Sequence, residues 1–159
     1  MRFSILAAVL FLSLQQTPAI ANNPSPTLDL MPVPARIEIG SGVFVVDEGF
    51  TVSIAGEGAS PRLHRGIHRM LRRLSDRSTI FFANEVFLDI GDRDAAAMTV
   101  TAARIGELKV GEDESYRLQI TNSGITLEAA TDIGALRGLQ TLLQLLRLDE
   151  RGVTLPVIT

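Results

Sequence analysis

Two histidines, His64 and His68, have the spacing that comes nearest to a metal site in this sequence. A separation of four residues places both side chains on one side of a helix, as in zinc sites of the H-E-x-x-H type. In that arrangement a glutamate follows the first histidine, whereas Arg65 stands there in this chain. Further arginines surround the pair, no cysteine is present and no third ligand is evident. We therefore expect no metal site, and zinc-dependent chemistry at these histidines is an alternative that zinc titration tests.

Adjacent carboxylates are the second group that could do chemistry, because a pair of carboxyl groups can serve as acid and base in glycosidic bond hydrolysis. Such chemistry needs a concave pocket that excludes water, whereas Asp113 and Glu114 lie in a polar turn that precedes a predicted strand. The glycines at Gly40 and Gly56 carry neither a P-loop nor a dinucleotide fingerprint. We therefore expect no catalytic residue and no cofactor. The pairs are Asp47-Glu48, Asp113-Glu114 and Asp149-Glu150.

The N-terminus has the order of a secretory signal peptide. Arg2 supplies a positive charge, Phe3 to Leu14 is an apolar run, and Ala19-Ile20-Ala21 provides small residues for cleavage. The apolar run is shorter than the roughly 20 residues that span a bilayer. We therefore expect residues 1–21 to be removed on export to the periplasm or the medium, and residues 22–29 to form a flexible lead. Cysteine is absent, so neither a disulfide nor a lipidated cysteine is available.

The composition of 15 basic and 18 acidic residues gives a formal net charge of −3. This balance argues against a general attraction to nucleic acid, and against binding to an anionic membrane once the signal peptide is removed. Tryptophan is absent and tyrosine occurs once, so the chain has few aromatic rings to stack on sugar rings.

Hydrophobic periodicity predicts the elements of the fold. Ile37 and Ile39 alternate with polar residues as in a strand, Gly40 to Gly42 suggests a turn, and Val43–Val46 and Phe50–Ile54 suggest further strands. Ser60 and Pro61 mark a helix start. The helix, Ser60–Asp76, has one apolar stripe, and its opposite face carries Arg62, Arg65, Arg69, Arg72 and Arg73.

Residues 86–90 suggest another strand, and Met98–Thr101 a further one, whereas 102–111 match no pattern. Residues 114–130 predict a hairpin that turns at Asn122-Ser123-Gly124. A leucine-rich helix follows, with Thr131 or Asp132 as its N-cap. This order predicts an α+β fold over residues 30–159, with a mainly antiparallel β-sheet and both helices on one face.

Two blocks of the sequence resemble the N-terminal domain of family 20 glycoside hydrolases, the β-N-acetylhexosaminidases and chitobiases. They are "LMPVPARIEIGSGVFVV" and "ESYRLQI…GITLEAATDIGALRGLQTLLQLL", and the similarity extends over most of Leu30 to Thr159. The resemblance implies a small α+β domain that precedes a catalytic (β/α)₈ barrel. The family's His-x-Gly-Gly-Asp-Glu motif is absent from this sequence. We therefore expect the barrel to be missing from this chain and the chain alone to be inactive. The complete enzyme would hydrolyse terminal N-acetylhexosamine residues.

The leucine-rich helix carries more leucine than one stripe needs. On a helical wheel, Leu145 and Leu148 fall outside the stripe that would cover the domain's own sheet. Because the resemblance places a barrel next to this end of the domain, we expect an interdomain surface here, in cis with the barrel. Its candidate residues are Arg137, Gln144, Leu145, Arg147 and Leu148. The alternative is a free-standing exported domain that binds a protein or a glycan.

Overall fold

The computed structural model describes residues 28–78, 80, 87–88 and 96–159. The expected signal peptide and nearly all of the lead lie outside these residues. The described chain forms one β-sheet and two helices, α1 (Pro61–Ser78) and α2 (Asp132–Leu145). The strands are β1 (Ile39–Val46), β2 (Val52–Ala55), β3 (Phe87–Leu88), β4 (Met98–Arg104), β5 (Tyr116–Ile120), β6 (Ile125–Thr131), β7 (Arg147–Asp149) and β8 (Gly152–Ile158).

The sheet has the order β1-β8-β5-β6-β4-β2-β3, and β7 pairs with β8. Its β1, β8, β5 and β6 strands pair antiparallel, whereas β6, β4, β2 and β3 pair parallel. The α+β class is confirmed, but the sheet is mixed rather than mainly antiparallel. Parallel neighbours require a connection that carries the chain back: α1 follows β2 before β3 and β4, and β5 runs between β4 and β6. The alternation of polar and apolar residues along a strand does not indicate whether the strand pairs parallel or antiparallel with its neighbours.

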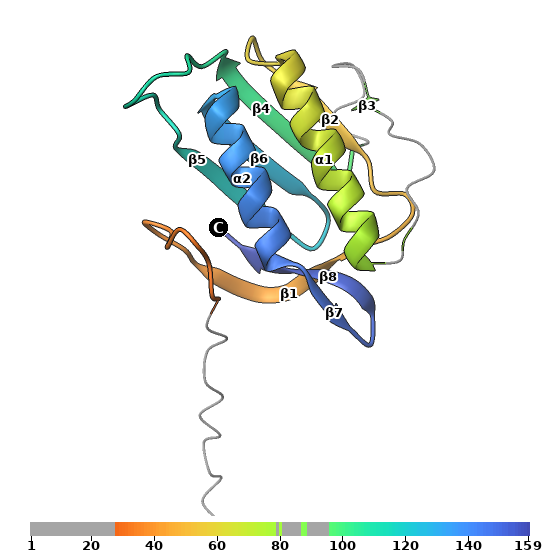
Figure 1. The fold of residues 1–159 in the computed structure, drawn as a ribbon. Coiled ribbons are helices and arrows are strands. Elements are labelled where there is room, and N and C mark those ends of the chain that lie inside the picture. The colour runs from red at the N-terminus through yellow and green to blue at the C-terminus, as the bar shows by residue number, and fades with distance from the viewer. Residues whose placement is uncertain (1–27, 79, 81–86, 89–95) are drawn as a thin grey trace, which may run out of the picture.

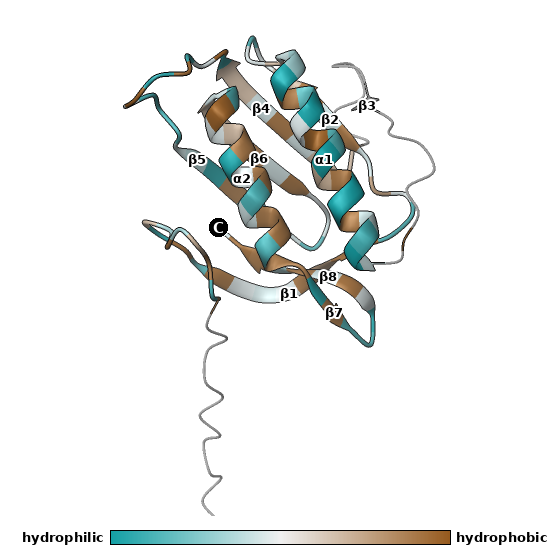
Figure 2. Cartoon of the chain, viewed as in Figure 1, coloured by the Kyte–Doolittle hydropathy of each residue, from teal (hydrophilic) through white to brown (hydrophobic). Residues whose placement is uncertain are grey.

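Both helices lie side by side on the same side of the sheet (Figure 1). The outward side of α1 is hydrophilic (Figure 2), and its apolar stripe, including Leu63, Ile67 and Met70, is buried. Two glycines allow the close packing of this layer. A Cβ on Gly66 would lie 2.1 Å from Leu136 Cδ2, and one on Gly138 would lie 2.2 Å from Leu127 Cδ1. A larger residue at either position would force the facing leucine side chain to shift, and Leu127 is fully buried and has little room to do so.

Strand β1 runs through the predicted turn. The Gly40–Gly42 segment forms a bulge, since the register with β8 shifts between Ile39 and Val43. Gly42 has a φ of 100°, which favours glycine. The partner of Val43 is Pro156, and a proline cannot donate to a strand ladder, so it suits an irregular position. Sequence periodicity did not predict β7 or β8.

Each helix begins at a side-chain cap. Ser60 Oγ accepts a hydrogen bond of 3.1 Å from the Leu63 amide, and Thr131 Oγ1 accepts one of 3.0 Å from the Gly134 amide. Thr131 is therefore the cap of α2, and Asp132 occupies the first helical position. Of the predicted strand at 86–90, the described part is β3; the rest lies outside the described residues. None of the helices in the described chain is both long and apolar enough to cross a membrane.

Candidate interdomain surface

Helix α2 ends at Leu145, and this end decides which leucines reach the surface. Leu146 has extended backbone angles, φ −59° and ψ 132°, so Leu148 lies on β7 rather than on the helix. Leu145 is 1% exposed and belongs to the core, whereas Leu148 is 75% exposed. The expectation that Leu145 is exposed is wrong. The unpredicted β8 also contacts α2.

Two of the expected surface residues make contacts within the chain. Gln144 Oε1 accepts a hydrogen bond of 2.8 Å from the Met31 amide, and its Nε2 donates one of 2.9 Å to the Met31 carbonyl. The Arg137 guanidinium donates to both Glu114 carboxylate oxygens, at 2.9 and 3.0 Å. These bonds lower the pKa of the Glu114 carboxyl. Gln144 thus holds the segment that enters β1, and Arg137 holds the start of β5.

Arg147 and Leu148 remain exposed on β7. Beside them is a pocket of about 130 Å³, whose lining is Arg77, Leu146, Arg147, Leu148 and Val153. We call these five residues the β7 surface. One apolar side chain of a partner would fit a hollow of this size. The surface combines an exposed leucine, two arginines and an apolar floor, which is a common composition for the centre of a protein contact.

The β7–β8 hairpin is held by the Asp149 carboxylate. It accepts hydrogen bonds from the Arg151 guanidinium at 2.6 Å, from the Arg151 amide at 2.8 Å and from Thr154 Oγ1 at 3.2 Å. These contacts, those of the Arg151 side chain above all, lower the pKa of Asp149. Gly152 completes the turn with a φ of 101°. The hairpin therefore presents Leu148 from a fixed position.

A second exposed apolar group lies on the loop between β4 and β5, within the segment that sequence patterns left unassigned. Ile105, Leu108 and Val110 are exposed there, and Leu108 is 85% exposed. The loop is held by Glu112, which accepts from Arg104 at 2.6 Å and from the Glu107 amide at 2.7 Å. These bonds, together with one from the Asp113 amide, lower the pKa of Glu112 to about 2.

A buried carboxylate, Asp132, joins both helices to this loop. Its side chain is 0% exposed. Oδ2 accepts from Ser60 Oγ at 2.5 Å and Arg62 Nε at 3.0 Å, and Oδ1 accepts from Arg62 Nη2 at 2.7 Å and the Gly106 amide at 2.8 Å. Burial alone raises the pKa of this carboxyl, but the hydrogen bonds from Arg62, Ser60 and Gly106 outweigh it and the pKa is lowered. Every acceptor direction is used by the chain itself, so this carboxylate has a structural role.

The adjacent carboxylates lie in turns rather than in a cavity. Asp47 accepts from the Gly49 amide at 2.8 Å, and Asp113 accepts from the Ser115 amide at 2.8 Å, while Asp149 holds the β7–β8 turn. His64 and His68 are partly buried on α1, and both make contacts with other groups. Within the described ranges, no three His, Cys, Asp or Glu side chains come together as ligands for a metal ion.

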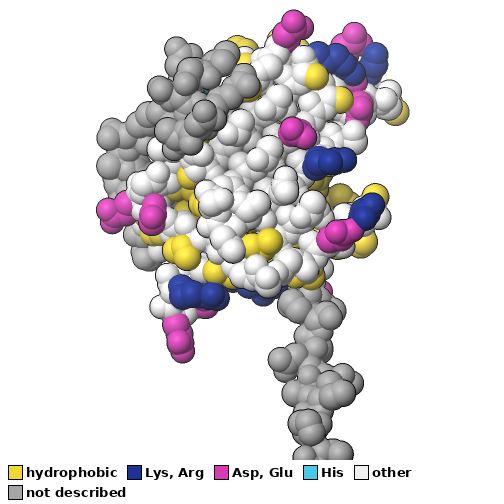
Figure 3. Space-filling model, turned by 180° about the vertical axis from the view of Figure 1, so that it is seen from behind, with side chains coloured by type: hydrophobic (Ala, Val, Ile, Leu, Met, Phe, Trp, Pro, Cys, Tyr) yellow, Lys and Arg dark blue, Asp and Glu magenta, His cyan; other side chains and the backbone are white. Residues whose placement is uncertain are grey.

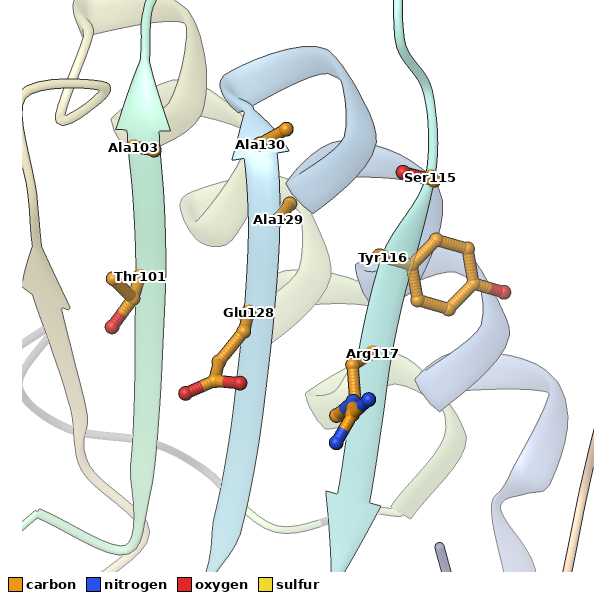
Figure 4. A pocket seen from close by; sticks show the side chains of 8 residues that line it. All are labelled: Thr101, Ala103, Ser115, Tyr116, Arg117, Glu128, Ala129 and Ala130. Carbon is orange, nitrogen blue, oxygen red and sulfur yellow. The ribbon is translucent and has the colours of Figure 1, made fainter.

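The side of the sheet that faces away from the helices is open. Atoms that are neither hydrophobic nor charged cover most of its middle (Figure 3). A depression of about 320 Å³ lies here, lined by Thr101, Ala103, Ser115, Tyr116, Arg117, Glu128, Ala129 and Ala130. Its Thr101, Glu128 and Arg117 side chains come from three neighbouring strands in register (Figure 4). Glu128 and Arg117 are both exposed to solvent in this depression.

Comparison with known proteins gives a consistent result. The model of the family described as "beta-acetyl hexosaminidase like" matches residues 30–145. Beta-hexosaminidase 1 of Arabidopsis thaliana is 29% identical over 157 residues, a match that covers 89% of this chain and 29% of the plant protein. Beta-hexosaminidase subunit beta of Entamoeba histolytica is 55% identical over 40 residues, covering 25% of this chain and 7% of its own length.

Among solved structures, the chitobiase of Flavobacterium johnsoniae superposes with a TM-score of 0.76 at 37% identity. That match covers 82% of this chain and 20% of the chitobiase. The chain therefore spans between a fifth and a third of the length of the longer relatives that it matches along most of its own sequence.

Proposed function

This chain belongs to the beta-acetyl hexosaminidase-like family, and from that premise we propose that it is the N-terminal accessory domain of an exported β-N-acetylhexosaminidase. In this proposal a catalytic (β/α)₈ barrel, which residues 30–159 do not include, removes terminal N-acetylhexosamine from glycans. The present domain supports that barrel and contributes no catalytic group. The comparisons do not favour the alternative of a free-standing interaction domain.

The observation that carries the proposal is the extent of the chitobiase match. It includes 82% of this chain at 37% identity, yet only 20% of the chitobiase. Asp47, Asp113 and Asp149 are engaged in turns, and the Asp132 carboxylate is saturated by hydrogen bonds.

We place the contact with the barrel at the β7 surface. Leu148 leaves 75% of its surface in water, and covering it would contribute about 1–2 kcal/mol. The adjacent pocket offers a complementary hollow, and Arg147 offers a guanidinium at its rim. The proposal rests on Leu148 and Arg147, because Leu145 is buried and because Gln144 and Arg137 already make hydrogen bonds within the chain.

Export to the periplasm or the medium is part of the proposal and is supported by the sequence of residues 1–21. Mass spectrometry of the protein from its native cell tests it. A mature chain that begins at or near Asn22 is the expected result. A chain that retains Phe3–Leu14 would contradict export through a cleaved signal peptide.

Activity is tested with an aryl N-acetyl-β-glucosaminide that releases a chromophore. The 159-residue chain is compared with any longer product of the same gene. We expect activity in the longer product and none in the 159-residue chain. Hydrolysis by the 159-residue chain alone would contradict the accessory role.

The contact is tested in the longer product with Leu148→Glu and with Leu108→Glu as the matched control, because Leu108 is also a highly exposed leucine. We expect Leu148→Glu to lower the thermal stability of the two-domain protein and Leu108→Glu to leave it unchanged. A larger effect of Leu108→Glu would move the contact to the β4–β5 loop and refute its placement at β7.

A further inference from the structure

The outward face of α1 carries three arginines that the fold does not use. Arg65, Arg69 and Arg72 are exposed and follow one another at intervals of four and three residues. This spacing places them along one face, within about 10 Å of helix axis. In the described part of the chain, none of the three guanidinium groups makes a hydrogen bond or an ion pair. We call Arg65, Arg69 and Arg72 the arginine stripe.

Three other arginines of α1, Arg62, Arg73 and Arg77, serve the fold. Arg62 pairs with Asp132, Arg73 donates to Gln140 Oε1 at 3.0 Å, and Arg77 donates to the Leu143 carbonyl at 2.8 Å. These contacts join α1 to α2. The contrast shows that the stripe is not required for the packing of the two helices.

The stripe is locally unfavourable for α1. Arg65 and Arg69 are like charges at i, i+4, and Arg69 and Arg72 are like charges at i, i+3, and both spacings are destabilising. The first turn of α1 contains no acidic residue of its own, and the Asp132 carboxylate at this helix end is occupied by Ser60 and Arg62. The stripe is a local group of positive charges in a chain whose formal net charge is −3. Binding of an anionic partner would relieve this repulsion.

The chemistry of the stripe suits repeated anionic groups on a polymer. Guanidinium groups bind carboxylates and phosphates through paired hydrogen bonds, and the negative net charge of the chain argues against a nucleic acid. The three groups lie within about one Debye length at 0.1 M salt, so a ligand with repeated charges meets them as one patch. The described helices expose no large hydrophobic side chain, because the exposed ones are on strands, loops and the N-terminal segment. The stripe therefore lacks the apolar centre of a protein interface.

We propose that the arginine stripe binds a glycan polymer that carries carboxylate groups, and so holds the protein close to polymeric material. The choice of a glycan among carboxylate polymers rests on the proposed function. The binding is electrostatic and does not depend on aromatic stacking, which agrees with the absence of tryptophan.

The test measures binding of the full chain to polygalacturonate, with neutral dextran and poly-L-glutamate as comparison polymers. We expect binding to polygalacturonate at 20 mM salt, weaker binding to poly-L-glutamate and none to dextran. If each arginine releases a counterion as at a single-stranded polyanion, the plot of log affinity against log salt has a slope of about −2.

The double variant Arg65→Gln/Arg69→Gln is expected to lower the affinity for polygalacturonate about tenfold or more and to flatten the salt slope. The matched control is Arg36→Gln/Arg117→Gln, which removes the same charge from two other exposed arginines. This control is expected to change the affinity by less than twofold. Circular dichroism of both variants verifies that α1 remains folded.

Three results would overturn the proposal: no binding to polygalacturonate at 20 mM salt, equal losses in the two double variants, or tighter binding to poly-L-glutamate. Tighter binding to phosphatidylserine vesicles would also overturn it and would indicate a membrane surface. Failure of the proposed function is distinguishable, because it appears in the chromophore assay. The stripe variant leaves hydrolysis of a small aryl glycoside by the longer product unchanged.

Discussion

Replacing Asp132 by asparagine tests the structural role of the buried carboxylate. Each carboxylate oxygen accepts two hydrogen bonds: Oδ1 from Arg62 and Gly106, and Oδ2 from Ser60 and Arg62. Whichever way the amide of an asparagine is turned, its NH₂ group faces two donors. Two hydrogen bonds are therefore lost, and the Arg62 guanidinium loses its counterion.

The magnitude follows from these contacts. Removing one partner of a buried ion pair costs about 3–5 kcal/mol. Arg62 keeps 26% of its side chain exposed, so water partly compensates its charge and we expect a loss of about 3 kcal/mol in the free energy of unfolding. A domain is typically stable by about 5–15 kcal/mol. The variant should thus fold, with a melting temperature lower by roughly 10 °C.

Urea unfolding followed by circular dichroism measures this difference. Glu128→Gln, on the open side of the sheet, is the control and should stay within about 0.5 kcal/mol of the parent. A double-mutant cycle with Arg62→Gln should give a coupling of about 1.5 kcal/mol or more. A loss below about 1 kcal/mol for Asp132→Asn would refute the view that this carboxylate ties the two helices to the β4–β5 loop.

Three further predictions follow from other contacts. In the folded chain the pKa of Glu112 is lowered to about 2, so its stabilising contribution is complete above the ordinary value of 4.5 and is lost as the pH falls towards 2. An NMR titration of the Glu112 carboxyl measures this pKa, and Arg104→Gln should raise it. Gln144→Ala removes two hydrogen bonds to Met31. Amide hydrogen exchange should therefore become faster around residue 31, while the free energy of unfolding changes by about 1 kcal/mol or less. Unchanged exchange around residue 31 would contradict the contact. Gly134→Ala places a Cβ 2.4 Å from the Ser115 carbonyl oxygen. Thermal unfolding should therefore show a loss of about 1–3 kcal/mol in the free energy of unfolding, although alanine has the better helix propensity. A variant as stable as the parent would show that the two backbone segments can move apart.

Local patterns predicted much of the fold because the forces behind them act within a few residues. Ser60 and Pro61 start α1 where the capping preference places it, and the apolar stripe of α1 is buried. The β5–β6 hairpin is also confirmed, with Tyr116 opposite Ala129 and Ile120 opposite Ile125. The α+β class follows from these elements.

The strand partners and directions could not be predicted in the same way. Gly40 and Gly42 suggested a turn, since glycine serves turns and bulges alike, and only pairing with β8 shows that the segment is a bulge. Strand β8 itself contains Pro156, which weakens any strand pattern. The parallel pairing of β2, β4 and β6 depends on how the connecting segments run, not on the alternation of polar and apolar residues within a strand.

The candidate surface illustrates the same limit. A helical wheel treats Leu145 and Leu148 alike, but the extended backbone of Leu146 ends the helix between them. One leucine enters the core and the other reaches the surface. The partners of Gln144 and Asp132 are also remote in sequence: Met31 is 113 residues from Gln144, and Ser60 is 72 residues from Asp132.

The amino-acid sequence by itself determined the helices, the hairpin, the fold class and the family resemblance, because caps, turns and hydrophobic periodicity depend on neighbouring residues. Tertiary structure alone decided the mixed strand order, the saturation of the Asp132 carboxylate and the exposure of Leu148. Each of these depends on which distant segments fill the space beside a side chain, and that is fixed only when the whole sheet and both helices pack together.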